Sequence, residues 1–145
     1  MIAPLLLATT MSFADPAGAK VTLDEPGMLY LVDFWAEGCK GCIEEMPELE
    51  RLARELERTG RFRLISVLWG GWRGAELNKF AERYGMGRPL HSDPDGWLEK
   101  LGKPALPTKV LVRDGEILKH HVGGGAGAYR YWKPIVEKAL APASP

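Results

Sequence analysis

Residues 29–42 read LYLVDFWAEGCKGC, and residues 43–49 continue as IEEMPEL. The nearly unbroken apolar run at the start predicts a strand that is covered on both of its faces. This run ends in a short polar turn with Cys39 and Cys42, and the residues that follow begin an amphipathic helical pattern. The expected order of elements is therefore strand, cysteine pair and helix.

The position of Cys39 favours a thiolate. At or just before a first helical turn, unpaired backbone N–H groups and the positive end of the helix dipole stabilise an anion. Because the thiolate is the nucleophilic form of cysteine, a Cys-x-x-Cys pair at this position suits thiol–disulfide exchange. The chain has only these 2 cysteines, which cannot form a disulfide framework or the usual four-ligand zinc site. We interpret Cys39 and Cys42 as a redox pair.

The residues around this pair resemble a known superfamily. Residues 32–37, VDFWAE, together with the Cys-x-x-Cys pair, are similar to the active-site segment of the thioredoxin superfamily. The continuation Cys-x-x-Cys-x-x-Glu-x-Pro, which ends in Glu45 and Pro47, is more similar to its TlpA/ResA branch. That branch is extracytoplasmic and supplies reductant to partner proteins. A second match, Leu-Pro-Thr at residues 106–108, resembles the superfamily's loop with a cis-proline that faces the dithiol.

The resemblance implies an α/β thioredoxin-like fold, with a central mixed β-sheet flanked by helices and an N-terminal β-hairpin. With 145 residues, the chain is long enough for one such domain, spanning residues 1–145. We expect residues 1–10 to be disordered or the remnant of a leader, and residues 141–145 to be a frayed tail. The apolar pattern agrees with this fold. It predicts a hairpin over 11–23, strands over 62–69, 109–112 and 116–122, and helices that begin near residues 39, 72, 97 and 132.

Two carboxylates near the cysteines are candidate catalytic groups. Asp33 lies within an apolar strand, where burial is costly to a carboxylate and should raise its pKa. The resemblance implies that Asp33 lies beneath the dithiol and assists proton transfer with Cys42; a structural acid paired with a lysine is the alternative. Glu45 lies one helical turn beyond Cys42 and could face the dithiol, where its charge would raise a thiol pKa. Its neighbour Glu44 serves as a control, and a solvated helix glutamate is the alternative for both.

Four further residues are candidates for substrate binding. Pro107 is expected to be cis, and such a bond would let the backbone of Leu106 pair with an extended substrate segment. Thr108 completes this loop. Lys40, between the two cysteines, would stabilise a thiolate as a nearby ammonium group.

Some positions are interpreted as structural. Phe34, Trp35 and Trp69 are expected to pack around the site as core. The three histidines, His91, His120 and His121, are expected to be structural or exposed, because the last two lie on opposite faces of a strand. Pro134 is compatible with a final helix only near its first turn.

The predicted function is that of a thiol–disulfide oxidoreductase that reduces disulfides of exported partner proteins. Cys39 would attack the partner disulfide and Cys42 would resolve the mixed disulfide, without a bound cofactor or metal. Electrons would come from a dithiol donor, which in TlpA/ResA-like proteins is usually a membrane reductase. Two other functions stay open: a thiol peroxidase, and a metal-binding or chaperone module that uses the same cysteines.

Composition and the resemblance also bear on partners and location. Lysine plus arginine and aspartate plus glutamate both number 19, so no general attraction to nucleic acid or anionic membranes is expected. We expect a monomer in an extracytoplasmic, periplasmic location, with an export signal or anchor preceding Met1; a cytoplasmic location is the alternative.

Overall fold

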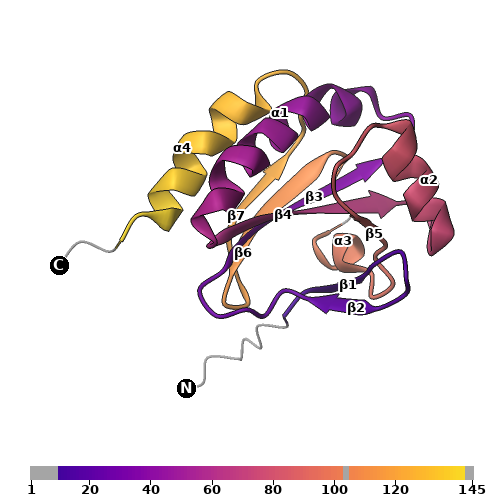
Figure 1. Ribbon diagram of the computed structural model, residues 1–145, viewed down its shortest axis with the longest axis horizontal. Coiled ribbons are helices and arrows are strands. Elements are labelled where there is room, and N and C mark those ends of the chain that lie inside the picture. The colour runs from indigo at the N-terminus through magenta and orange to yellow at the C-terminus, as the bar shows by residue number, and fades with distance from the viewer. Residues whose placement is uncertain (1–9, 103–104, 143–145) are drawn as a thin grey trace.

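The computed structural model describes residues 10–102 and 105–142 (Figure 1). Its elements follow in chain order: β1 (Ser12–Ala14), β2 (Lys20–Thr22), β3 (Leu29–Ala36), α1 (Lys40–Leu56), the 3-10 helix η1 (Glu57–Thr59), β4 (Phe62–Trp69), α2 (Ala75–Arg83), β5 (Leu90–His91), α3 (Trp97–Lys100), β6 (Thr108–Arg113), β7 (Glu116–Val122) and α4 (Ala128–Leu140).

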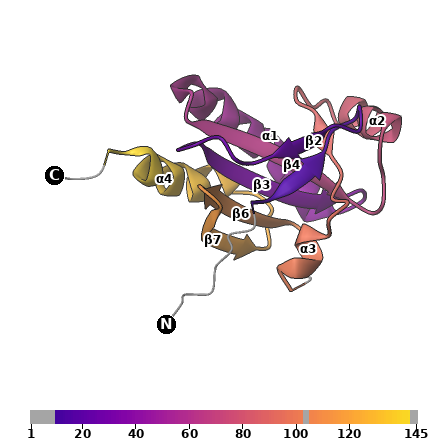
Figure 2. The ribbon, with the colours of Figure 1, turned by 90° about the horizontal axis from the view of Figure 1, so that it is seen from below.

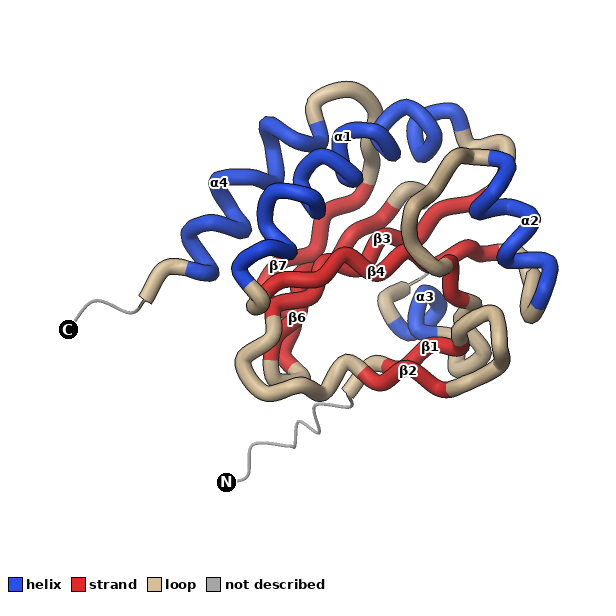
Figure 3. The backbone as a smooth tube through the Cα atoms, viewed as in Figure 1, coloured by secondary structure: helices blue, strands red, loops and turns tan. Residues whose placement is uncertain are grey.

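The central sheet has five strands in the order β5-β4-β3-β6-β7. Strand β3 pairs with β4 in parallel and with β6 in antiparallel orientation, and β6 and β7 form an antiparallel hairpin. Strands β1 and β2 form a separate two-stranded antiparallel ribbon, which Figure 3 shows apart from the main sheet. The predicted thioredoxin-like fold, with a mixed sheet flanked by helices and an N-terminal hairpin, is confirmed.

The two faces of the sheet are covered by different elements. Tyr30, Val32 and Phe34 of β3 pack with residues of the hairpin and of α3 on one face. Leu31 and Trp35, which alternate with them along the strand, pack on the other face against residues of α1. Figure 1 shows α1 and α4 above the sheet and the hairpin with α3 below it, and Figure 2 shows the hairpin from below, in front of β3 and β4. Strand β3 is therefore buried on both faces, as its apolar run predicts.

Most differences from the predicted elements are small and concern their ends. Strand β4 has the predicted bounds, and β6 extends the predicted strand by one residue at each end. Helix α2 begins at Ala75 instead of near Trp72. No strand was predicted at residues 90–91, where the structure has the two-residue strand β5, which contains His91. A two-residue strand is too short to leave a period-2 pattern in the sequence.

The expectation for Pro134 is wrong. Helix α4 begins at Ala128, so Pro134 lies in the helix interior, beyond the first turn. Its ring nitrogen cannot donate a hydrogen bond to the carbonyl of Arg130. Both residues are exposed, so water can bind that carbonyl in place of the missing donor.

The expectations for the chain ends fall mainly on residues 1–9 and 143–145, outside the residues that the structure describes. Within the described part of the chain, no helix combines the length and the apolar character needed to span a bilayer.

Candidate active site

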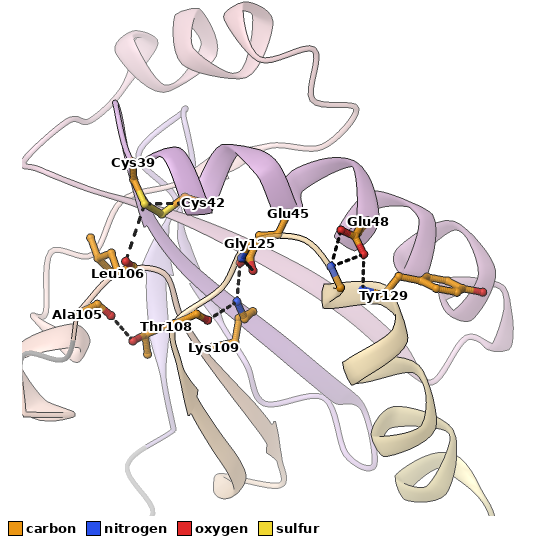
Figure 4. Close-up of polar contacts among 12 residues, drawn as sticks. Cys39, Cys42, Glu45, Glu48, Ala105, Leu106, Thr108, Lys109, Gly125 and Tyr129 are labelled. Atoms are coloured by element: carbon orange, nitrogen blue, oxygen red, sulfur yellow. Dashed lines mark hydrogen bonds and ion pairs between the residues drawn. A yellow bond between two sulfur atoms is a disulfide. The ribbon is translucent and has the colours of Figure 1, made fainter.

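The two cysteines lie where β3 leads into α1. Cys39 is the N-cap residue of α1, with an extended backbone conformation, and the backbone N–H of Cys42 donates to Cys39 Sγ at 3.2 Å. The two sulfurs form a disulfide, with their Cα atoms 5.2 Å apart (Figure 4). When this bond is reduced, the same N–H and the positive end of the helix dipole stabilise negative charge on Cys39 Sγ.

The two cysteines differ in their exposure to solvent. Cys39 is half-buried, whereas Cys42 is 1% exposed and packs among Trp35, Met46 and Leu68. A partner disulfide can therefore approach the sulfur of Cys39 but not that of Cys42. This asymmetry fits the predicted order, in which Cys39 attacks and Cys42 resolves.

The loop before β6 forms a second wall of the site. The Leu106–Pro107 peptide bond is cis, as predicted. The carbonyl oxygen of Leu106 lies 3.9 Å from Cys39 Sγ, so the loop backbone adjoins the more exposed sulfur (Figure 4). The side chain of Thr108 is fully buried, and its hydroxyl donates to the carbonyl of Ala105 at 2.6 Å. Thr108 therefore holds the loop in shape, and the loop's backbone is the part that lies next to the disulfide.

A glycine loop, residues 123–127, forms a third wall that the sequence pattern did not reveal. The N–H of Gly123 donates to the carbonyl of Pro107 at 2.8 Å. A Cβ added to Gly124 would lie 2.5 Å from Pro107 Cγ and even closer to Glu45 Oε2, so only glycine fits there. A Cβ added to Gly41 would lie 3.6 Å from the carbonyl oxygen of Gly124. The glycine loop thus contacts the cis-proline loop and lies beside the segment between the cysteines.

Glu45 and Glu44 have opposite environments. Glu45 is fully buried and accepts hydrogen bonds from Lys109 Nζ at 2.5 Å and from the N–H of Gly125 at 3.3 Å. Burial raises the pKa of Glu45, while the bonded ammonium of Lys109 acts in the opposite direction. Glu44 is exposed and pairs with Lys40 at 3.9 Å, which places the Lys40 ammonium at the surface of the first helical turn. The structure therefore separates Glu45 from its neighbour and gives it Lys109 as its direct partner.

Asp33 is buried at the centre of the sheet. Its side chain is 4% exposed, and among the described residues Oδ1 has no hydrogen-bond partner. Burial raises the pKa of Asp33 to about 7, with the charge of Lys109 lowering it and that of Glu45 raising it further. The raised pKa agrees with the prediction from the sequence. A lysine does lie beside Asp33, yet its ammonium is bonded to Glu45.

Lys109 is the functional candidate that sequence reasoning missed. It is 1% exposed and directly opposite Asp33 in the antiparallel pair of β3 and β6. A lysine at the start of an apolar strand is a signal of burial with a partner, because an unpaired buried ammonium is costly. The partner could not be identified without the strand register.

The expectation that Trp69 is part of the core is wrong. Phe34 and Trp35 are fully buried, but Trp69 ends β4 with 47% of its surface exposed. It lines a cavity of about 700 Å³ that also includes Trp72 and the turn of the β1–β2 hairpin. The last residue of a strand extends beyond the helices that cover the sheet, so its apolar character did not predict burial.

The histidines lie as expected, in structural or exposed positions. His91 is buried, and its Nδ1 lies 3.1 Å from the carbonyl oxygen of Ser66. His120 is exposed, and His121 packs against Tyr131 and Trp132. Across residues 10–102 and 105–142, no three His, Cys, Asp or Glu side chains form a group that could hold a metal ion.

Comparison with known proteins points to one group of enzymes. No protein-family model matches the chain. The thiol-disulfide oxidoreductase ResA of Halalkalibacterium halodurans is 30% identical over 122 residues, which cover 81% of this chain and 67% of that protein. The thioredoxin-like protein YneN of Bacillus subtilis is 30% identical over 120 residues, which cover 80% of this chain and 69% of that protein.

A solved structure gives the same result for the fold. The thioredoxin domain of a thiol-disulfide oxidoreductase from Bacteroides vulgatus superposes with a TM-score of 0.74 at 24% identity, covering 97% of this chain and 100% of that one. In this chain a disulfide lies at the N-terminus of α1, beside a cis-proline loop. Fold, site and sequence relatives agree, and the chain belongs to the ResA-like thiol–disulfide oxidoreductases of the thioredoxin superfamily.

Proposed function

We propose that this oxidoreductase reduces disulfides of exported partner proteins by dithiol exchange through Cys39 and Cys42. The observation that carries the proposal is the asymmetry of the pair: Cys39 is partly exposed, with its Sγ beside the backbone of Leu106, while Cys42 is almost fully buried. A partner's disulfide can reach only one of the two sulfurs.

The reaction begins with both cysteines reduced. The Cys39 thiolate attacks one sulfur of the partner disulfide, which forms a mixed disulfide and releases the other partner sulfur as a thiolate. Cys42 then loses its proton and attacks Cys39 Sγ. The Cys39–Cys42 bond forms, the bond to the partner breaks, and the second partner sulfur leaves as a thiolate. Two electrons have passed to the partner, and the enzyme is left oxidised.

Neighbouring residues have defined tasks in this scheme. The Leu106–Pro107–Thr108 loop presents its backbone to an extended segment of the partner, in the manner of strand addition. Asp33 takes up the proton that Cys42 loses, because a carboxyl with a pKa of about 7 exchanges protons near neutral pH. Lys40, on the surface beside Cys39, favours the thiolate by its charge. The two sulfurs carry the electron pair, so the cycle needs no bound cofactor.

Kinship with ResA supports an extracytoplasmic, periplasmic location, because the ResA-like branch that the sequence resembles works outside the cytoplasm. A second dithiol protein, such as a membrane reductase, regenerates the reduced form by the same exchange run in reverse. The enzyme acts as a monomer, since one chain carries both cysteines and the loop beside them.

Single cysteine variants test this function. With insulin as the disulfide substrate, Cys39→Ser abolishes reduction, whereas Cys42→Ser stops after the first attack and accumulates a mixed disulfide. Glu44→Gln is the control, because Glu44 is an exposed residue of the same helix. Normal turnover by either cysteine variant would refute the assignment.

The direction of electron flow is tested by the reduction potential of the Cys39–Cys42 pair. A reductase should have a potential closer to that of thioredoxin, about −270 mV, than to that of the oxidant DsbA, about −120 mV. Equilibration with glutathione buffers of known ratio gives the value. A potential near that of DsbA would identify an oxidant and contradict the proposed reductase.

A further inference from the structure

A row of polar side chains crosses the sheet at the level of Asp33. In the register of the strands, Asp33 lies opposite Ser66 of β4 and opposite Lys109 of β6, and Lys109 lies opposite His121 of β7. Alternate residues of a strand share a face. Asp33 therefore faces the helices, like the Leu31 and Trp35 that flank it and pack against α1.

Helix α1 adds a second carboxylate above this row. Glu45 reaches down to Lys109, whose ammonium bonds to Glu45 Oε1 at 2.5 Å and to the carbonyl of Gly123 at 3.3 Å (Figure 4). Asp33, Glu45 and Lys109 are all at most 4% exposed. The interior of the protein thus contains two carboxyl groups and a single ammonium group in one cluster.

The charges in this cluster do not balance when both carboxyls are ionised. The ammonium of Lys109 neutralises one carboxylate. A second carboxylate that is shielded from water would lower the stability of the folded protein. One of the two carboxyls therefore has a strong tendency to hold a proton. Glu45 has two donors for its charged form, Lys109 Nζ and the N–H of Gly125, whereas Asp33 Oδ1 has no partner among the described residues. The proton accordingly belongs on Asp33.

We propose that Lys109 is a positioning residue of the dithiol site: its ammonium holds Glu45 as a carboxylate and leaves Asp33 as the group that gains and loses the proton of Cys42. The proposal deepens the dithiol exchange described above and rests on it for its kinetic consequence. In the resolving step, the S–H bond of Cys42 breaks, its proton moves to the Asp33 carboxylate, and its electron pair forms the bond to Cys39 Sγ. Lys109 itself transfers no proton in this step.

Other ionisable groups around the cluster fit this assignment. Burial lowers the pKa of His121, with the charge of Lys109 acting in the same direction, so the imidazole is neutral at pH 7 and adds no second cation. Glu48 of α1 raises the pKa of Glu45, but its own oxygens accept from the N–H groups of Gly127 and Tyr129. Lys109 is therefore the cation that decides between the two carboxyls.

Solvent reaches the cluster beside the glycine loop. The residues that line a cavity of about 310 Å³ include Glu45, Lys109, His121 and the glycine loop, residues 123–127. Asp33 is not among the residues that line this cavity, so of the three side chains in the cluster it lies farther from the opening than Glu45 and Lys109.

Titration of the Asp33 carboxyl carbon by NMR in the oxidised protein tests the proposal directly. In Lys109→Met, Asp33 loses the positive charge beside it, and its midpoint rises by about one pH unit or more. In Glu45→Gln, Asp33 loses the competing negative charge and keeps the whole ammonium, so its midpoint falls. Two variants of one ion pair thus shift Asp33 in opposite directions.

Two matched controls remove the same charges at exposed positions. Lys119→Met lies in the same β6–β7 hairpin but on the exposed surface, and Glu44→Gln is the helix neighbour of Glu45. Neither should move the Asp33 midpoint. In a kinetic readout, the pH at which insulin reduction becomes half-maximal should follow the Asp33 midpoint upward in Lys109→Met and downward in Glu45→Gln.

Defined outcomes overturn the proposal. An Asp33 midpoint that is unchanged in Lys109→Met refutes it, and so does a midpoint that rises or stays in Glu45→Gln. Should Lys109→Met fail to fold, the direction of the Glu45→Gln shift decides alone. A wild-type protein that reduces no disulfide would refute the proposed function instead, while the NMR titration would still decide the role of Lys109.

Discussion

Two ion clusters in this protein each contain one basic and two acidic side chains, but they differ in how the acidic groups are bonded. In one, Arg88 binds Glu50 and Glu57; in the other, Lys109 binds Glu45 beside Asp33. In the Arg88 cluster the guanidinium contacts both oxygens of Glu50, at 2.7 and 3.3 Å, and both oxygens of Glu57, at 3.0 and 3.1 Å.

The difference comes from the geometry of the two cations. The five N–H donors of arginine form a planar fork that serves two carboxylates at once. The three donors of the Lys109 ammonium serve one carboxylate and a backbone carbonyl, and Asp33 Oδ1 is left without a partner. The Arg88 cluster therefore ties α1 and η1 to β4 through hydrogen bonds to both glutamates and to the carbonyl of Leu64, while the Lys109 cluster retains a carboxyl that can exchange a proton.

The largest loss of stability is expected from Arg88→Met. The change leaves Glu50, Glu57 and the carbonyl of Leu64 without their shared donor, in a region where Arg88 is only 13% exposed. The free energy of unfolding should fall by roughly 3 kcal/mol, less than for a fully buried pair because both glutamates retain some contact with water. Urea denaturation at pH 7 measures the loss.

Arg63→Met is the control for this variant. Arg63 also pairs with a glutamate, Glu25, but both side chains are about half exposed, so the change should cost at most about 0.5 kcal/mol. In Arg88→Met the pH dependence of insulin reduction should keep its wild-type midpoint. A shifted midpoint would contradict the assignment of a purely structural role to the Arg88 cluster.

The second prediction concerns Asp33, whose replacement should raise the free energy of unfolding instead of lowering it. Because the pKa of Asp33 is raised to about 7 in the folded protein, ionised Asp33 destabilises the fold. The penalty is absent below about pH 4, grows between about pH 4 and pH 7, and is complete above that range. Asp33→Asn, which cannot ionise, should therefore be more stable than wild type at pH 8, by roughly 2 to 4 kcal/mol, where the upper value corresponds to the full shift of the Asp33 pKa, and it should lose this advantage at pH 4.

Denaturation at several pH values checks this prediction, and Asp24→Asn, an exposed aspartate, should show no such pH dependence. The stabilised Asp33→Asn enzyme should also reduce insulin at least about tenfold more slowly at pH 8, because Cys42 has lost its proton acceptor. A variant that is less stable than wild type at pH 8 would show that Asp33 is a structural partner of Lys109.

This contrast also explains which parts of the site could be predicted from the sequence. The cysteine pair and the buried aspartate lie in a continuous apolar strand and turn, where local pattern was enough to find them. The cis-proline was predicted from the resemblance of a short continuous motif, residues 106–108, to the thioredoxin superfamily. Lys109 and Gly124 contribute through neighbours that are far away in the chain: Asp33 and Glu45 for the first, Pro107 and Glu45 for the second. Such contacts depend on the register of the strands and on how closely the loops pack in the folded protein. Neither can be read from the spacing of residues along the sequence.

The same reasoning applies to the fold. Eight-residue strands such as β3 and β4 have a clear apolar signature, and the bounds of β4 were predicted to the residue. The two-residue β5 and the proline within α4 depended on tertiary contacts and solvent exposure, which overrode local preference. Burial is also hard to predict from residue type alone. Trp69 is apolar, yet it is 47% exposed because it is the last residue of β4.

The smallest expected loss of stability comes from adding a methyl group to a glycine beside each cluster. Gly124 adjoins Glu45 and Pro107, where an added Cβ would collide with both, whereas Gly87, next to Arg88, has open space around its Cβ position. Gly124→Ala should lower the free energy of unfolding by about 1 to 2 kcal/mol, because either the glycine loop or the Glu45 carboxylate must move. Gly87→Ala should change it by about 0.5 kcal/mol or less.

The two glycine variants also differ in their expected effect on protonation. Displacing Glu45 from Lys109 frees part of the ammonium's charge for Asp33, so the Asp33 midpoint in Gly124→Ala should fall as in Glu45→Gln, but by a smaller amount. In Gly87→Ala the midpoint should stay at the wild-type value. If Gly124→Ala lost stability with no change at Asp33, the glycine loop would serve only to pack against Pro107, and the protonation of the cluster would depend on its three side chains alone.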